Sequence, residues 1–157
     1  MKATGRLRLT VRSADGALAA ERRAHNTVLR GGAHIVARLF AGQDDPAPID
    51  AVGVGFGQDV ADIEATQLTP PPDGAIPAEA LRGPIGADGV SITSDQPNAV
   101  VVSIAARFTP TVELPDVTEA GLLAGDRLYN QVVFEPVTLR PGQEVTFFWD
   151  VEFPFGH

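Results

Sequence analysis

The sequence contains no cysteine, which excludes disulfide bonds and thiolate metal sites and fits a chain made in a reducing cytoplasm. It also lacks any apolar run of the roughly 18 residues that a membrane-spanning helix needs, so no membrane partner is expected. The first eleven residues alternate polar and apolar side chains, whereas a signal peptide needs a continuous apolar stretch. With 157 residues, 44% of them hydrophobic, the chain is expected to form one domain, residues 1–157, around a single core.

No nucleophile, base or cofactor motif stands out in the sequence. The glycines at Gly53, Gly55 and Gly57 superficially resemble a dinucleotide-binding motif. A phosphate cradle needs a helix N-terminus to supply N–H groups, and no helix clearly follows these glycines. A strand that needs glycine for close packing is therefore the favoured interpretation.

Metal ligands are equally sparse. Asp44, Asp45 and Asp50 offer oxygen ligands for calcium, but they lack the regular spacing of a calcium loop, which favours a solvated turn. No pair of histidines has the spacing of a metal-binding helix; the three are His25, His34 and His157. We therefore expect a protein that is not an enzyme and has no catalytic, cofactor-binding or metal-binding residues, with an unrecognised active site as the remaining alternative.

Charge is distributed unevenly along the chain. Residues 1–40 carry eight basic and two acidic residues, a balance of +6, whereas residues 41–157 carry four basic and 18 acidic residues, a balance of −14. The total of −8 makes nucleic acid an unlikely partner for the whole surface. Two interpretations of the asymmetry stay open: copies of the chain stack basic face on acidic face, or folding interleaves the two regions and cancels it.

The C-terminal third has a clear period-2 pattern over residues 144–153. This alternation predicts a strand with one face in the core and the other toward solvent or a partner. The residues predicted to face the core are Val145, Phe147, Trp149, Val151 and Phe153. The segment Arg140-Pro141-Gly142-Gln143 suits a type II turn, because proline presets φ and glycine accepts a positive φ. The pattern predicts a β-hairpin in which this turn joins a strand over residues 127–139 to the last strand.

A second hairpin is predicted at the N-terminus. Residues 2–12 alternate, with Leu7 and Leu9 on the inward face and a row of cations on the other, and the turn at 13–16 leads to a return strand over 17–24. The outward row comprises Lys2, Arg6, Arg8 and Arg12. The row is interpreted either as the charged edge strand that prevents indiscriminate pairing or as a contact with another subunit. Candidate acidic partners for such a contact are Asp116, Glu119, Asp150 and Glu152.

The middle of the chain predicts one helix and two further strands. The helical pattern covers residues 26–41 and closes at Gly42. Because Gly31 and Gly32 weaken the first turn, the helix itself could start only at Gly32 or Ala33. Its apolar stripe, expected to pack on a sheet, comprises Val28, Ile35, Val36, Leu39 and Phe40. Strands are predicted over 49–56 and 99–108, and residues 109–126 are predicted to be a connector with one helical turn at 118–121.

Residues 69–89 form a long loop rich in proline and glycine. Loops of this length inside a compact domain are generally functional or disordered, so we interpret it as an arm that orders on a neighbouring subunit. Its prolines Pro70, Pro71 and Pro72 and the C-terminal Phe155 join the basic row as candidate interface residues. Together the patterns predict a mainly β fold: an antiparallel, jelly-roll-like β-sandwich with one covering α-helix.

Three blocks of the sequence carry a family resemblance. They are Asn26, Val28 and Gly32 leading into 35–42; the glycine-rich block 52–57; and residues 119–122 together with 128–136. In this order they resemble small structural proteins of tailed bacteriophages and of related phage-like contractile particles, associated with tails, baseplates and fibres. The resemblance covers most of the chain except residues 69–89. It implies a β-rich scaffold with no catalytic residues, and an Arg often stands in the family where Gln131 stands here.

The expected function is therefore structural. The chain is predicted to be a subunit of a virion or phage-like particle, assembled in the bacterial cytoplasm through contacts with copies of itself and with other particle proteins. A capsid decoration protein is the first alternative, since it could have the same fold and surface. A carbohydrate-binding module is weaker, because such modules display several exposed aromatics and Trp149 is predicted to face inward.

Overall fold

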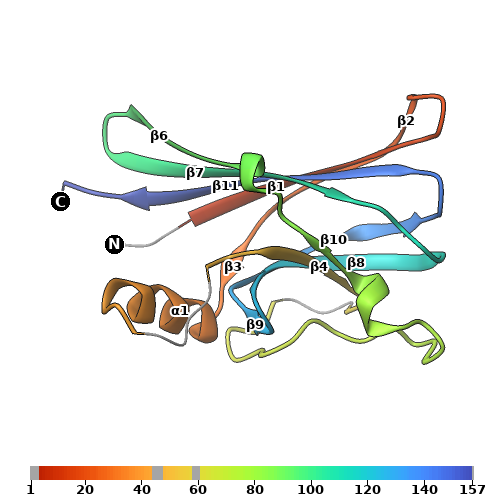
Figure 1. The fold of residues 1–157 in the computed structure, drawn as a ribbon, viewed down its shortest axis with the longest axis horizontal. Helices are drawn as coiled ribbons and strands as arrows, with labels where there is room; N and C mark the ends of the chain where they lie inside the picture. The colour runs from red at the N-terminus through yellow and green to blue at the C-terminus, as the bar shows by residue number, and fades with distance from the viewer. Residues whose placement is uncertain (1–3, 44–47, 58–60, 157) are drawn as a thin grey trace.

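Two antiparallel β-sheets face each other in the computed structural model, which describes residues 4–43, 48–57 and 61–156 (Figure 1). The first sheet has the order β2-β1-β11-β7-β6. Its strands are β1 (Thr4–Arg12), β2 (Leu18–His25), β6 (Val90–Gln96), β7 (Ala99–Phe108) and β11 (Glu144–Pro154). Lys2, Asp44, Asp45 and His157 lie outside the described residues.

The second sheet has the order β3-β10-β8-β4-β5, with β9 paired to β8. Its strands are β3 (Thr27–Val28), β4 (Ala51–Gly55), β5 (Arg82–Pro84), β8 (Leu114–Ala124), β9 (Arg127–Leu128) and β10 (Asn130–Leu139). The remaining elements are the α-helix α1 (Arg30–Phe40) and two short 3₁₀ helices, η1 (Ala78–Leu81) and η2 (Ala87–Gly89). The predicted β-sandwich with one α-helix is confirmed.

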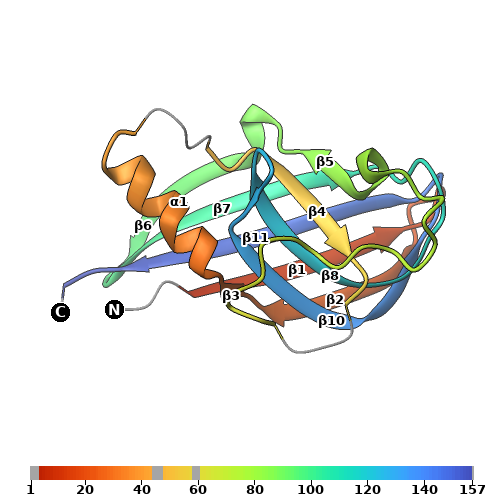
Figure 2. The same ribbon diagram turned by 90° about the horizontal axis from the view of Figure 1, so that it is seen from below.

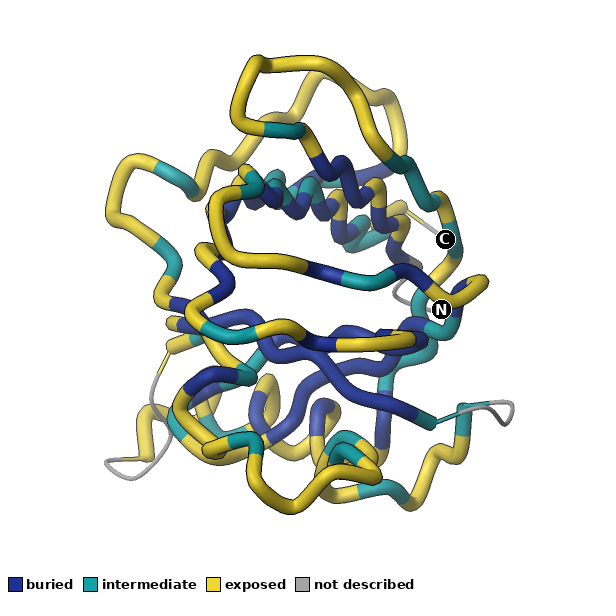
Figure 3. Tube along the Cα trace, turned by 90° about the vertical axis from the view of Figure 1, so that its right-hand side faces the viewer, coloured by how far each residue is buried: buried dark blue, intermediate teal, exposed yellow. Residues whose placement is uncertain are grey.

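The core lies between the sheets, where the alternation of β11 places its apolar side chains. Val145, Phe147 and Trp149 are fully buried, and Val151 is 4% exposed. Phe147 stacks on Trp149 with ring centroids 5.6 Å apart and meets the ring of Phe108 edge-on at 6.0 Å. Figure 3 shows the buried segments gathered in the two layers, with exposed loops around them. The predicted inward position of Trp149 is confirmed.

The N-terminal hairpin is confirmed as the antiparallel pair β1 and β2. Leu7, Leu9 and Val11 point into the core, whereas Arg6 and Arg8 are exposed. However, β1 lies between β2 and β11 in the sheet, so it is an interior strand. The interpretation of its arginines as protection of a sheet edge is therefore wrong.

The predicted C-terminal hairpin is wrong, although its turn is correct. Gly142 has φ +88°, and the N–H of Gln143 donates to the Arg140 carbonyl at 3.2 Å, as a tight turn requires. The flanking strands do not pair with each other, because β10 belongs to the second sheet and β11 to the first. The turn therefore carries the chain from one layer of the sandwich to the other.

The predicted connector over 109–126 is also wrong, since it contains β8, a central strand of the second sheet. Residues 117–122 are buried without interruption. Such a strand shows no period-2 alternation, because both of its faces are covered. The described segment 61–77 runs across the outer side of this sheet and covers it (Figure 2).

The helix α1 begins at Arg30, before the predicted start at Gly32 or Ala33, and ends at Phe40, with Gly42 just beyond it in the left-handed region at φ +68°. The placement of Val28 on its apolar stripe is wrong, because Val28 lies in β3, and the rest of the stripe is only partly buried. Ile35 is 2% exposed, but Leu39 is 45% and Phe40 94% exposed. The helix thus packs through Ile35 and leaves the apolar side chains of its last turn in solvent.

The loop predicted over 69–89 is not a free arm along its whole length. Its second half contains η1, β5 and η2, and β5 pairs with β4. At its start, the Thr69 carbonyl accepts the N–H of Phe56 at 3.1 Å, and further along Ala80 is buried. Much of the segment therefore packs on its own domain.

Candidate interaction surface

The outward side chains of β1 stand between those of β11 and β2 on the outer face of the first sheet. The antiparallel register brings each arginine opposite one residue of either neighbouring strand. The cross-strand pairs are Arg6 with Asp150 and His25, Arg8 with Phe148 and Arg23, and Arg12 with Glu144 and Leu18. The row of cations thus faces a partly acidic row on β11 of the same molecule.

Ion pairs compensate much of the charge on this face. Arg6 lies 3.5 Å from the Glu152 carboxylate, and Arg107 of β7 lies 3.7 Å from that of Glu144. Two of the acidic residues proposed as partners of the basic row, Asp150 and Glu152, therefore stand on the same sheet as that row. Folding interleaves the basic and acidic regions here, as the second interpretation of the charge asymmetry expects.

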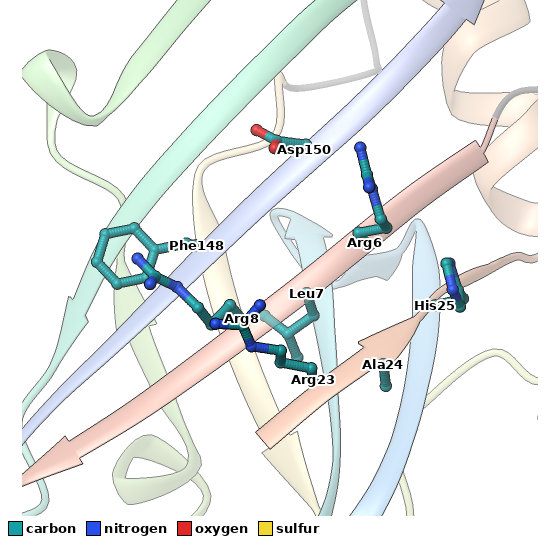
Figure 4. A pocket seen from close by; sticks show the side chains of 8 residues that line it. All are labelled: Arg6, Leu7, Arg8, Arg23, Ala24, His25, Phe148 and Asp150. Carbon is teal, nitrogen blue, oxygen red and sulfur yellow. The ribbon is translucent and has the colours of Figure 1, made fainter. Parts of the chain in front are cut away.

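Arg8 and Arg12 are the exceptions among the described residues of this row. Arg12 donates to the Gly16 carbonyl at 3.2 Å, and the guanidinium of Arg8 stacks on an aromatic ring. Its Cζ atom lies 4.5 Å from the ring centroid of Phe148, and among the described residues it makes no ion pair within 4.0 Å. Figure 4 shows the Arg8 side chain lying across this ring with Arg23 beside it. Together these residues line an open groove of about 660 Å³, which we call the Arg8 groove. Its lining residues are Arg6, Leu7, Arg8, Arg23, Ala24, His25, Phe148 and Asp150.

The groove has a local excess of positive charge. Arg23 donates a hydrogen bond to Glu21 at 2.7 Å, and this bond, together with the nearby charges of Arg23, Arg8 and Arg12, lowers the pKa of the Glu21 carboxyl. Arg8 and Arg23 stand directly opposite each other, an arrangement of like charges that is unfavourable on a sheet surface. A carboxylate from a partner protein would relieve it and could accept hydrogen bonds from both guanidinium groups.

The remaining interface candidates lie apart from this groove. Pro70 and Pro72 are exposed and Pro71 is half-buried, in the segment that covers the second sheet. Phe155 is 45% exposed, and its N–H donates to the Asn98 carbonyl at 2.9 Å. The structure therefore brings Arg6 and Arg8 together and leaves the prolines and Phe155 at separate places.

A buried carboxylate that sequence analysis misplaced on the surface organises the second sheet. Glu119 of β8 is 1% exposed, accepts a 2.7 Å hydrogen bond from Nε2 of Gln131, and also accepts the N–H of Thr69. A Cβ at Gly55 or Gly57 would overlap this carboxylate. Gly55 and Gly57 thus make room for Glu119, whereas a Cβ at Gly53 would meet the side chains of Leu68 and Leu123 at 3.1 Å. Close packing is what the glycine motif predicted.

The comparisons with known proteins add no relative. No protein-family model matches the chain, and no curated protein or solved structure shows a significant match to it.

Within the described residues, no group of three or more His, Asp or Glu side chains is placed to hold a metal ion. In the same part of the chain, no helix is long and apolar enough to cross a bilayer.

Proposed function

We propose that this chain is a non-enzymatic structural subunit of a phage virion or phage-tail-like particle, which assembles through contacts with copies of itself and with other particle proteins. The Arg8 groove is the observation that carries the proposal. Arginine and aromatic side chains are enriched at protein interfaces, and an arginine without a carboxylate partner is available to one. The phage-like order of the sequence blocks supports the same assignment.

Exposed apolar side chains near one end of the sandwich give additional support. Val36, Leu39 and Phe40 of α1 are all at least 40% exposed. The helix lies at the end of the molecule where the C-terminus also lies (Figures 1 and 2). Apolar side chains gathered on one surface are characteristic of proteins that bind other proteins.

The carbohydrate-binding alternative gains no support from the aromatic residues. Trp149 is fully buried and Tyr129 is 3% exposed, so neither can form a platform for a sugar ring. A capsid decoration protein would use the same kind of surface, and the location of the chain within isolated particles distinguishes it from a tail component.

The proposal is tested by incorporation of tagged variants into particles in cells that produce them. The groove variant is Arg8→Gln with Arg23→Gln, and the control is Arg30→Gln with Arg140→Gln, which removes the same charge from two exposed ion pairs elsewhere. We expect the groove variant to fold but to be lost from sedimented particles, whereas the control is incorporated. Equal incorporation of both variants would show that the Arg8 groove is not a contact.

A further inference from the structure

Strand β6 has an unpaired edge. It is the last strand of the first sheet, its one strand partner among the described residues is β7, and all seven of its residues are exposed. The N–H and C=O groups along such an edge can pair with another strand, so soluble proteins usually protect their edges with charges, prolines, bulges or covering segments.

Two other sheet edges, β2 and β5, carry such protection. At the opposite edge of the same sheet, Arg22 of β2 donates from Nε to the Glu135 carbonyl at 2.9 Å and from Nη2 to the Pro136 carbonyl at 2.7 Å, which ties β2 to β10. At the edge of the second sheet, β5 contains Pro84. The end of β6 carries one charge, Asp95, where the register with β7 shifts between Thr93 and Gln96. Its first part, residues 90–93, pairs regularly with β7 and contains no charged residue and no proline.

The apolar side chains of this edge are exposed as well. Val90 is 42% and Ile92 71% exposed, although the register places Ile92 opposite Val102 of β7 and on the side of the sheet that faces the core. An additional strand beside β6 would remove part of Ile92 from water and would pair the free backbone groups.

We infer that β6 pairs antiparallel with β6 of a second copy, on a two-fold axis at Ile92, and that two sandwiches thereby share one continuous sheet. With this register, Ile92 faces Ile92 of the second copy, Ser91 faces Thr93, and Val90 faces Ser94. Isoleucine packs on isoleucine, hydroxyl lies beside hydroxyl, and no like charges oppose one another within residues 90–94. This self-complementarity favours a second copy as the occupant, since a two-fold contact requires the same patch on both partners.

The inference deepens the proposed function, because it names a contact between subunits, and it rests on that function for its biological role. Its test uses the isolated chain, so the two can fail separately. A chain that is monomeric alone but incorporated into particles overturns the β6 pairing and leaves the proposed function standing. A dimer that never enters particles supports the β6 pairing and overturns the proposed function.

The experiment measures mass in solution by sedimentation over a wide dilution series. The wild-type chain should form a dimer at high concentration, with slower hydrogen exchange at the β6 amides. Ile92→Lys should be monomeric, because two lysines would then face each other across the axis. The matched control is Leu18→Lys, which changes a 50% exposed leucine on the protected edge strand β2 and should remain dimeric.

A charge-rescue mixture tests the register itself. Ile92→Glu alone should be monomeric, whereas an equimolar mixture with Ile92→Lys should form a heterodimer, since residue 92 faces its own counterpart. A monomeric wild-type chain, open-ended aggregation, a dimer that Ile92→Lys leaves intact, or a mixture that stays monomeric would each overturn the inference.

Discussion

The buried carboxylate of Glu119 should contribute more to stability than any exposed acidic residue of the chain. It accepts one hydrogen bond from the Thr69 backbone and one from the Gln131 side chain. Hydrogen bonds to charged groups contribute about 1.5–3 kcal/mol each, so Glu119→Ala should lower the free energy of unfolding by about 3–6 kcal/mol. Since domains of this size are stable by only about 5–15 kcal/mol, the variant should be close to the limit of folding.

Urea denaturation measures this effect, with Glu113→Ala as the control. Glu113 forms an exposed ion pair with Arg140 at 3.1 Å, which should contribute only about 0–1 kcal/mol. Limited proteolysis of Glu119→Ala should cut first within 61–69, because Thr69 loses its anchor. A Glu119→Ala variant that unfolds within about 1 kcal/mol of the control would refute the reasoning.

Three further substitutions test the packing. Trp149→Ala should cost about 3–5 kcal/mol, as truncation of a buried aromatic usually does, and native tryptophan emission at a water-exposed wavelength would contradict its burial. Burial raises the pKa of Tyr129 above its usual 10.0, so this tyrosine ionises in the unfolded chain at a lower pH than in the folded protein. The free energy of unfolding should therefore fall as the pH rises above 10.0. Tyr129→Phe should reduce this alkaline loss of stability, measured by urea denaturation. Gly55→Ala should lower the melting temperature, because the new Cβ would overlap the Glu119 carboxylate. The control Gly74→Ala should not, because no atom lies within 4 Å of a Cβ at that position. Equal melting temperatures of the two variants would count against this packing.

Sequence patterns predicted the strands that bury one face, and also β4, all of whose residues are buried, but they failed at β8, where both faces are covered. The alternation in β11 and β1 follows directly from one core face and one solvent face. The uninterrupted burial of 117–122 in β8 left no such signal, and its short Thr118-Glu119-Ala120-Gly121 run was misread as a helical turn. The turn at Gly142 was correct locally, but no local feature specifies that the two strands enter different sheets.

The same limit applies to the candidate interaction surface. The row containing Arg6 and Arg8 could be read from β1 alone, because it depends only on alternation within one strand. Its compensation by β11 depends on a register between residues more than 130 positions apart, which the sequence does not reveal. The spacing of Gly53, Gly55 and Gly57 did indicate close packing, but nothing in the sequence pointed to the Glu119 carboxylate as its cause at Gly55 and Gly57.

Quantitative mass spectrometry of sedimented particles, isolated from cells that make this chain, tests the structural-subunit assignment most directly. The account predicts that the chain sediments with the other structural proteins of the particle, in a fixed ratio to them that survives repeated purification. Recovery of the chain only in the soluble fraction, while those proteins sediment, would contradict it.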